Sequence, residues 1–417
     1  MQQQKAVIVE VLDPHKKEVR EEYFEEFRLL VETLNINIVA ETTQFVKNIN
    51  YSFYLGKGKV EELREIAKLT EANYIFIDAK LTFLQLRNLS RVIEIPCIDR
   101  PHLILMIFSM RAKSAEGKLQ VELSDLRMRL PEIVHSNMYL DQQTASLLGL
   151  KGPGERKTEL KRRYIEARIG VLEEKIKTIK KGREERRKKR RKSNIPIVSI
   201  VGYTNSGKST LLNRLTDANA HVEDMLFATL DTLVREGDVG NGEKVLFIDT
   251  IGFIRDLPPA LIYAFHSTLE EILDSWLILL VVDISEKDFE EKMRIVEDTI
   301  KELGGEAIPE LIVFNKIDKI DRTQMESLKY RFENAFFISA LSGEGMETLK
   351  EAIKSMIEKA FVRAKLFIPV SEMGSISDIF EGTRVLSRKD LQDGTFLTVE
   401  GFFENVNKFK RYFITTT

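Results

Sequence analysis

The chain has 417 residues, of which 43% are hydrophobic and 31% charged, and its formal net charge is −2. This length predicts two to four domains with enough apolar material for a core in each. No apolar stretch reaches membrane-spanning length and the N-terminus lacks a signal-peptide pattern, so we expect a soluble protein without stable membrane insertion. The single cysteine, Cys97, cannot form an internal disulfide and fits a buried position in a reducing cytoplasm.

Residues 1–108 alternate short apolar runs with helical patterns. The predicted strands are 7–11, 36–40, 74–77 and 95–98, and the predicted helices are 18–34, 60–69 and 81–92. This alternation is typical of a small α/β domain with a partly parallel sheet.

Residues 109–192 have a different pattern. Leucines repeat at four- and three-residue spacing from Leu119 to Leu130, and apolar residues repeat similarly from Ile165 to Ile179. Such seams predict two long helices packed as an antiparallel coiled coil, separated by residues 131–158.

The second of these helices is strongly basic. Residues 151–192 hold 19 Lys and Arg against 7 Asp and Glu. The charge fits a surface for a polyanion such as RNA, and it equally fits a solvated helix that links two domains. The glycine-rich segment 149–155, which includes Lys151, would lie at the hairpin tip, as a nucleic-acid contact or as a mobile loop.

Residues 202–209 read Gly-Tyr-Thr-Asn-Ser-Gly-Lys-Ser and match G-x-x-x-x-G-K-[ST], the phosphate-binding loop of nucleoside triphosphatases. An apolar run at 197–201 predicts a buried strand before the loop, and 210–215 predict a helix after it. In such a loop the backbone N–H groups surround the phosphates, Lys208 reaches the β and γ oxygens, and the Ser209 hydroxyl binds magnesium. The residues expected to bind nucleotide here are Gly202, Tyr203, Thr204, Asn205, Ser206, Gly207, Lys208, Ser209 and Thr210.

Three further motifs follow predicted strands in the order typical of guanine-nucleotide-binding domains. Asp249-Thr-Ile-Gly252 would deliver a carboxylate to the magnesium shell through a bound water. Asp318 of Asn315-Lys316-Ile317-Asp318 can accept from both N1–H and the exocyclic amine of guanine, a donor pair that adenine lacks. Ser339-Ala340-Leu341 matches the loop that backs the guanine. The residues expected at the nucleotide from these motifs are Asp249, Gly252, Asn315, Lys316, Asp318, Ser339 and Ala340.

The C-terminal part follows a helix predicted over 346–360. Strands are predicted at 366–370, 383–386 and 396–399, with a short helix at 375–380. Residues 408–413 mix basic and aromatic side chains; stacking on single-stranded RNA is one interpretation, and a basic edge strand with buried aromatics is favoured.

These patterns predict an α/β fold class built on a P-loop GTPase domain at 193–361. It is flanked by an N-terminal small α/β domain at 1–108, a helical hairpin with a basic second helix at 109–192, and a small C-terminal α+β domain at 362–417.

Four segments resemble the HflX family of ribosome-associated GTPases, within the translation-factor-related class. They are 56–63, 111–123, 152–155 and 249–258, so the resemblance covers nearly the whole chain. Proteins of this family bind the large ribosomal subunit, and members are implicated in separating stalled or idle ribosomes. The resemblance implies that residues 1–192 face the ribosome, and it favours ribosomal RNA as the partner of the basic helix.

The resemblance also sets the expected biology. The expected partners are GTP and GDP and the large ribosomal subunit with its RNA, without DNA. We expect a cytoplasmic monomer, with partial membrane association left open. The main alternative is a GTP switch in ribosome assembly or stress signalling without splitting activity. An ATP-using RNA-remodelling protein is disfavoured, because Asp318 selects guanine and no helicase motif set is visible.

The expected hydrolysis machinery departs from common GTPase patterns in two places. Family members read Phe-Ala-Thr-Leu-Asp-Pro-Thr in the switch region, whereas residues 227–233 here end Asp-Thr-Leu; Thr229 still matches the threonine that ligates magnesium and senses the γ-phosphate. Many GTPases hold a water-orienting glutamine where this chain has Phe253. With Lys208 and Thr229 as the catalytic residues and Ser209, Thr229 and Asp249 as the magnesium set, we expect slow turnover that a ribosome stimulates. Asn205 occupies the position that ligates potassium in related GTPases, where that ion can replace the charge of an arginine finger.

Overall fold

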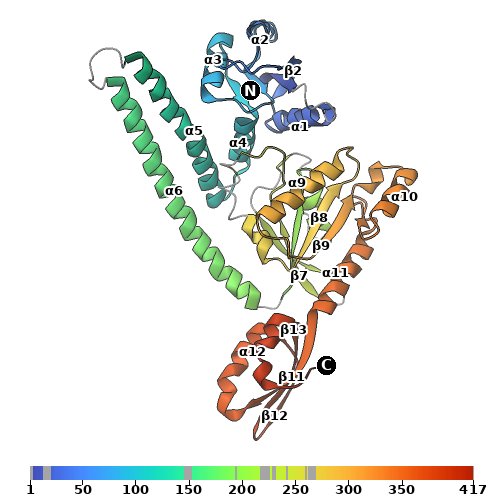
Figure 1. The fold of residues 1–417 in the computed structure, drawn as a ribbon. Coiled ribbons are helices and arrows are strands. Elements are labelled where there is room, and N and C mark those ends of the chain that lie inside the picture. Colours follow the sequence, from blue (N-terminus) through green and yellow to red (C-terminus); the bar gives the residue numbers. More distant parts are fainter. Residues whose placement is uncertain are drawn as a thin grey trace.

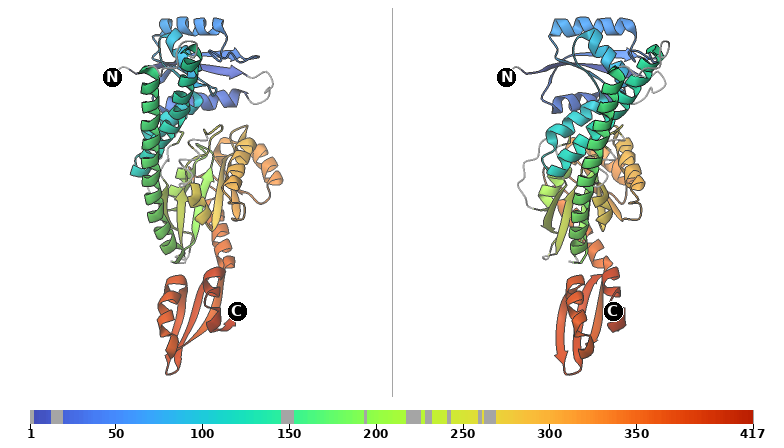
Figure 2. Two further views of the ribbon diagram at one scale, coloured as in Figure 1. Left: turned by 60° about the vertical axis from the view of Figure 1, so that its left-hand side comes forward. Right: turned by 90° about the vertical axis from the view of Figure 1, so that its left-hand side faces the viewer.

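The computed structural model describes residues 3–12, 20–144, 153–192, 195–216, 226–227, 232–240, 243–258, 261 and 269–416. Three sheets organise these residues into an elongated molecule, with the N-terminal unit at one end and the C-terminal unit at the other (Figures 1 and 2). The unit built on the central sheet, predicted as the GTPase domain, lies between them, and a long helical hairpin runs along one side. None of the helices in these described ranges is both long enough and apolar enough to cross a bilayer.

The N-terminal unit is a four-stranded sheet in the order β2-β1-β3-β4. Its elements are β1 (Lys5–Leu12), α1 (Arg20–Thr33), β2 (Asn37–Phe45), α2 (Lys57–Thr70), β3 (Tyr74–Ile77), α3 (Phe83–Ile93), β4 (Cys97–Asp99) and α4 (Arg100–Arg111). Every strand pairing in it is parallel, so the expectation of a partly parallel sheet is corrected. The reason is that helices connect successive strands, and such crossovers return the chain in the same direction.

The single cysteine gives a direct test of this unit. Cys97 is buried on β4, and burial raises the pKa of its thiol to about 12, although a hydrogen bond with Ser90 partly opposes the shift. We expect a thiol reagent at pH 8 to modify the native chain roughly 10³-fold more slowly than the chain in guanidinium chloride, where the pKa returns to about 8.5. Equal rates would contradict the burial of Cys97.

The same shift fixes the sign of a pH effect on stability. The folded protein holds the Cys97 proton at pH values where the unfolded chain has lost it, because the folded pKa is the higher one. The contribution of Cys97 to stability is therefore complete below the unfolded pKa and declines as the pH rises towards 12.

The hairpin consists of α5 (Ala115–Thr144) and α6 (Pro153–Lys192). The two helices lie side by side and run in opposite directions (Figure 1). Leu123 of α5 and Leu172 of α6, both from the predicted apolar seams, are buried. Ion pairs join the helices: Arg127 to Glu173 at 2.6 Å and Arg168 to Glu122 at 2.7 Å. The predicted helical hairpin is thus present.

The expected connection at residues 131–158 is wrong, because α5 continues through Pro131 to Thr144 and α6 already begins at Pro153. Pro131 is exposed, so its ring and missing N–H disturb the ladder on the outer side while α6 supports the other side. Residues 145–152, which include Lys151 of the expected basic tip, lie outside the described residues. The side chains of residues 153–158 and 186–192 also lie outside the description. The interpretations of the basic helix as an RNA surface and as a linker therefore both stay open.

The central sheet has the order β10-β9-β8-β5-β7-β6, and only the β6–β7 pairing is antiparallel. Its elements are β5 (Ile197–Gly202), α7 (Lys208–Leu215), β6 (Leu233–Asp238), β7 (Lys244–Asp249), β8 (Leu277–Asp283), α9 (Phe289–Glu302), β9 (Glu310–Asn315), α10 (Arg322–Arg331), β10 (Phe336–Phe337) and α11 (Met346–Ala360). Strands β5 and β8 are fully buried at the centre, as their continuous apolar runs require. The motif-bearing loops follow the carboxyl ends of β5, β7, β9 and β10, which meet at one edge of the sheet.

The C-terminal unit is a four-stranded antiparallel sheet in the order β12-β13-β11-β14. Its elements are β11 (Phe361–Pro369), α12 (Ile376–Gly382), β12 (Arg384–Leu391), β13 (Gly394–Phe402), α13 (Phe403–Asn407) and β14 (Phe413–Thr416). The expected edge strand at residues 408–413 is corrected, because Lys410–Tyr412 form a 3-10 turn and β14 begins only at Phe413. The turn lets Tyr412 enter the core and donate a hydrogen bond to Glu372, which a strand would not allow.

Candidate nucleotide-binding site

The nine residues expected at the phosphates run from Gly202 at the end of β5, through the loop 203–207, to Lys208, Ser209 and Thr210 in the first turn of α7. Asn205 and Gly207 have left-handed backbones, with φ of 61° and 92°. A Cβ on Gly207 would lie 2.2 Å from Asn315 Nδ2, so only glycine fits there. Thr204 Oγ1 and Ser206 Oγ are buried without a hydrogen-bond partner among the described residues, and such groups can receive an anionic ligand.

Lys208 is buried at the start of α7, and its ammonium donates a hydrogen bond to the Tyr203 carbonyl at 2.8 Å. Burial lowers the pKa of Lys208 to about 8, and the Asp249 carboxylate opposes part of this shift. Gly252 lies against the same ammonium, because a Cβ at Gly252 would be 3.1 Å from Lys208 Nζ. The phosphate loop and the loop after β7 therefore close around one buried cation.

The oxygens expected to hold magnesium are brought together in part. Ser209 Oγ donates to Asp249 Oδ2 at 2.7 Å, so a hydroxyl and a buried carboxylate meet at the end of β7. Hard oxygen ligands of this kind fit magnesium, which commonly takes one or two protein oxygens together with phosphates and waters. Thr229, the third expected ligand and the second expected catalytic residue, lies outside the described residues.

On the base side, Asn315 joins two loops. Its amide donates to the Ser206 carbonyl at 2.8 Å and its oxygen accepts from the Ala340 N–H at 2.9 Å. Ser339 is buried and its hydroxyl accepts from the Ser342 N–H at 3.1 Å, which closes the turn that follows β10. Asn315 therefore fixes the distance between the phosphate loop and the loop at Ala340.

Asp318 is exposed in the turn after β9, where its carboxylate remains accessible to a base. The neighbouring Lys316 has a left-handed backbone, with φ of 65°, and its ammonium pairs with Asp283 Oδ2 at 2.7 Å. This pair anchors the segment that carries Asp318 to the end of β8. The structure thus brings the base-side and phosphate-side residues to one edge of the central sheet.

Phe253 is buried and cannot direct a water molecule by hydrogen bonding. Its N–H donates to the Gly202 carbonyl at 3.2 Å, and its carbonyl accepts from the Thr204 N–H at 2.8 Å. These two bonds extend the sheet edge and point the ring into the core.

A buried polar network, which we call the Glu26 junction, connects the nucleotide loops to the N-terminal unit. Tyr203 OH donates to Glu26 Oε2 of α1 at 2.6 Å and accepts from the Arg255 N–H at 2.7 Å. The Arg255 guanidinium lies 3.2 Å from Glu26 and 3.1 Å from Asp288. The other oxygen of Glu26 pairs with Arg100 of α4. One carboxylate of α1 thus holds a phosphate-loop residue and a residue just beyond Gly252.

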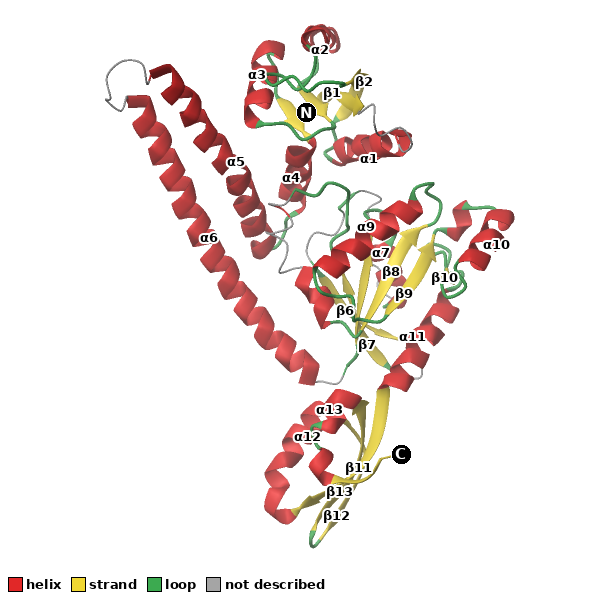
Figure 3. Ribbon diagram, in the orientation of Figure 1, coloured by secondary structure: helices red, strands yellow, loops and turns green. Residues whose placement is uncertain are grey.

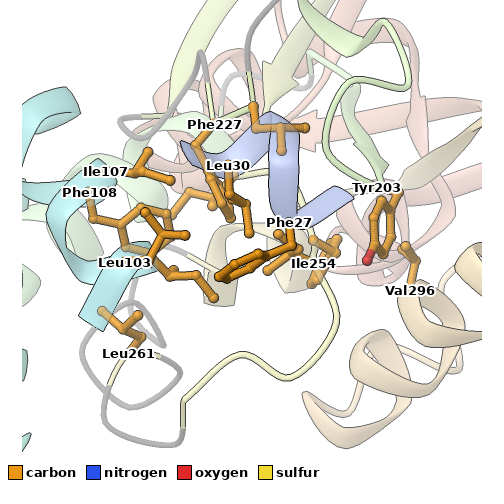
Figure 4. Packing of buried hydrophobic residues seen from close by; sticks show 14 of the residues in the cluster. Phe27, Leu30, Leu103, Ile107, Phe108, Tyr203, Phe227, Ile254, Leu261 and Val296 are labelled. Carbon is orange, nitrogen blue, oxygen red and sulfur yellow. The ribbon is translucent and has the colours of Figure 1, made fainter. Parts of the chain in front are cut away.

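An apolar cluster surrounds the Glu26 junction. Phe227, from the expected switch region, packs edge-on against Phe108 of α4 with ring centroids 4.6 Å apart. Figure 4 shows how side chains of α1 and α4 meet those of the GTPase domain in this cluster. The labelled residues are Phe27, Leu30, Leu103, Ile107, Phe108, Tyr203, Phe227, Ile254, Leu261 and Val296.

Sequence reasoning missed the roles of Glu26, Arg100 and Arg255 in this junction. Arg255 lies inside the motif 249–258, but nothing local marks Glu26 or Arg100 among the many charged residues. A tyrosine at a variable position of the phosphate loop was the one available signal, because a large aromatic side chain there must find space outside the nucleotide site.

Four family models match successive parts of the chain. They are described as GTP-binding GTPase N-terminal (residues 21–109), GTP-binding GTPase Middle Region (111–190), 50S ribosome-binding GTPase (197–316) and HflX C-terminal domain (325–406).

The chain is also similar to curated proteins along its length. A protein named GTPase HflX from Caldanaerobacter subterraneus subsp. tengcongensis is 36% identical over 411 residues, which cover 99% of this chain and 94% of the relative. GTPase HflX of Escherichia coli is 36% identical over 371 residues, covering 88% of this chain and 86% of that protein. Among solved structures, a GTP-binding protein from Sulfolobus solfataricus in complex with GDP is 26% identical with a TM-score of 0.46, covering 85% of this chain and 99% of that one.

Proposed function

Because this chain belongs to the HflX family of P-loop GTPases, we propose that it uses GTP on the large ribosomal subunit to separate stalled or idle ribosomes. In this proposal the protein is a cytoplasmic monomer, and residues 1–192 face the ribosome while 193–361 bind and hydrolyse GTP. Residues 362–417 form a separate C-terminal unit in this proposal.

The observation that carries the proposal is the Glu26 junction. Ribosome splitting requires that a change at the γ-phosphate reach the part of the protein that touches the ribosome. Tyr203 belongs to the phosphate loop and Arg255 to the segment just beyond Gly252, and both are bonded to Glu26 of the N-terminal unit. Phe227 adds an apolar contact from the switch region to α4. A change in either loop therefore bears directly on the ribosome-facing unit.

The charge for hydrolysis would come from this chain's own groups around the phosphates. Lys208 and the N–H groups at the start of α7 would stabilise the negative charge of the transferred phosphoryl group. Ser209 and Asp249, with Thr229, would hold magnesium, which supplies further positive charge to the phosphate oxygens when bound. Phe253 orients no water, so turnover of the protein alone is slow and the ribosome stimulates it.

Asn205 offers a site for potassium beside the phosphates. Its left-handed backbone places it at the turn of the loop, and its side chain has no hydrogen-bond partner among the described residues. We expect faster GTP hydrolysis in potassium chloride than in sodium chloride, and Asn205→Ala should abolish the difference. Equal rates of the unchanged protein in the two salts would remove the potassium site.

Guanine selectivity is expected to depend on Asp318. Replacement by alanine removes two charge-assisted hydrogen bonds to the base and should weaken GTP binding about 10- to 100-fold, with ATP binding unchanged. Competition of GTP and ATP against a fluorescent GDP analogue measures the affinities for both nucleotides. Glu326→Ala, in the exposed part of α10, is the matched control. Tight ATP binding by the unchanged protein would refute the assignment to guanine.

The proposed function is tested by measuring GTP hydrolysis with and without purified ribosomes while sedimentation follows intact ribosomes and subunits. Stimulated hydrolysis together with loss of intact ribosomes supports splitting, and Lys208→Ala should then show neither effect. Stimulation without dissociation would favour the alternative, a GTP switch in assembly or stress signalling. No stimulation would overturn the ribosome as partner.

A further inference from the structure

The C-terminal unit has the chain order β11-α12-β12-β13-α13-β14 and the sheet order β12-β13-β11-β14. This β-α-β-β-α-β arrangement puts β11 and β13 at the centre of the sheet and both helices on one side of it (Figure 3). The buried residues Ala364, Leu366 and Ile368 of β11 and Leu397 and Val399 of β13 pack with Ile379 and Val406 of the two helices. The alternate residues of both central strands consequently lie on the opposite face, which we call the open face.

Two phenylalanines lie together on the open face. Phe367 and Phe396 are direct cross-strand partners on β11 and β13, with ring centroids 4.9 Å apart. Phe396 is 38% exposed and Phe367 is half-buried. A Cβ at Gly394 would lie 2.9 Å from Phe367 Cζ, so the glycine leaves the space that this ring occupies.

Basic residues surround the two rings. Lys389 is the cross-strand partner of Phe396, and Lys365 precedes Phe367 by two positions on the same face. Both lysines are exposed and have no ion pair among the described residues, so their charges face solvent. Arg363 and Arg384 lie further along the face, where Glu400 is paired with Arg363 at 2.7 Å. The open face thus carries four cations and one carboxylate.

The other end of the open face is already covered. Phe361 and Phe402 pack on each other with centroids 4.8 Å apart, and Phe402 lies 5.7 Å from Trp276 of the GTPase domain. Packing against the GTPase domain therefore accounts for one aromatic pair of this face, but it leaves the Phe367–Phe396 pair accessible.

We propose that the open face binds single-stranded RNA, with bases stacked on Phe396 and Phe367 and phosphates neutralised by Lys365 and Lys389. Exposed rings on the two central strands of a four-stranded sheet provide π-faces for unstacked bases, and flanking lysines provide the charge for the backbone. A protein partner is less suited, since lysine is depleted in protein–protein interfaces. The choice of RNA rather than DNA as the ligand rests on the proposed ribosomal function. The stacking of bases on Phe396 and Phe367 does not depend on that function.

The test uses the full-length protein and a fluorescein-labelled twelve-nucleotide oligouridine in anisotropy titrations. Phe396→Ala is expected to weaken binding about 5- to 150-fold, the equivalent of one lost base stack, whereas Phe396→Tyr should retain it. Phe380→Ala is the matched control, because Phe380 is 46% exposed on α12, on the opposite side of the same sheet. A DNA oligomer of matching sequence that binds as tightly as the RNA would overturn the assignment to RNA.

Cross-linking separates this surface from the basic helix α6, whose charge makes it an alternative binding site for the same oligomer. A 4-thiouridine version is expected to cross-link to peptides of β11, β12 and β13, and Phe396→Ala should remove those cross-links. Cross-links confined to α6 would overturn the proposal. So would a Phe396→Ala protein that binds the oligomer normally but binds ribosomes weakly, because the open face would then hold a protein. A failure of ribosome splitting with intact oligomer binding would refute the proposed function and leave the RNA platform standing.

Discussion

Replacement of Lys208 by alanine is expected to lower the rate of GTP hydrolysis by about 10²- to 10³-fold, the usual effect of removing one preorganised charge from a transition state. Lys208 is buried between the phosphate loop and Gly252, and among the described residues its ammonium donates a hydrogen bond only to the Tyr203 carbonyl. Burial lowers the pKa of this lysine to about 8, so keeping the ammonium charged in the folded protein is unfavourable in free energy. A cation held in this way is expected to serve an anionic ligand rather than stability.

Phosphate release from GTP, measured with and without ribosomes, checks this prediction. Lys301→Ala, on the exposed side of α9, is the matched control and should leave the rate unchanged. The thermal unfolding of both variants should resemble that of the unchanged protein. A Lys208→Ala protein that hydrolyses GTP within a few-fold of the normal rate would contradict the placement of the γ-phosphate at Lys208.

Replacement of Glu26 by alanine is expected to destabilise the protein by about 3–5 kcal/mol. This is the typical cost of leaving buried charges without their partner. Glu26 pairs with Arg100 and Arg255, and the side chains of both arginines are only 8% exposed. Removing the carboxylate also takes the acceptor from Tyr203 OH. The loss should appear in the first unfolding transition, because the junction joins two parts of the molecule.

A neighbouring glutamate provides the control. Glu25 pairs with Arg28 on the exposed side of α1, and such surface pairs contribute about 1 kcal/mol or less. Glu26→Gln keeps the shape but not the charge, so it should lie near Glu26→Ala if the charge is what matters. Equal melting temperatures for Glu25→Ala and Glu26→Ala would show that the junction contributes little to stability.

The sequence predicted the parts of the fold that depend on local pattern. The helix expected at 346–360 is α11 to the residue, and the strands before each nucleotide motif are present, because apolar runs and phosphate-loop glycines encode them locally. Pro131 misled the prediction of α5, since a rule for isolated helices does not include the support of α6. The turn at Lys410–Tyr412 likewise depends on the place of Tyr412 in a core that distant strands build.

The candidate site likewise has one part that the sequence predicted and one part that it did not. The residues of the four motifs could be predicted from their spacing, and the structure brings those it describes to one sheet edge. The Glu26 junction could not be predicted, because its hydrogen bonds join residues 177 and 229 positions apart. No periodicity or motif reports such a pairing; only the tertiary fold creates it.

The length of the 40-residue helix α6 determines how far a tilt of the hairpin would move its far end. At 1.5 Å per residue it is about 60 Å long, and near its base Lys180 pairs with Glu270 of the GTPase domain at 2.6 Å. This ion pair joins the lower part of α6 to the nucleotide domain. About 40 Å of helix separates Lys180 from Pro153 at the far end, so a tilt of roughly 10° at Lys180 would displace that end by about 7 Å. Under the proposed function, a small change beside the nucleotide would therefore become a larger movement at the far end of α6.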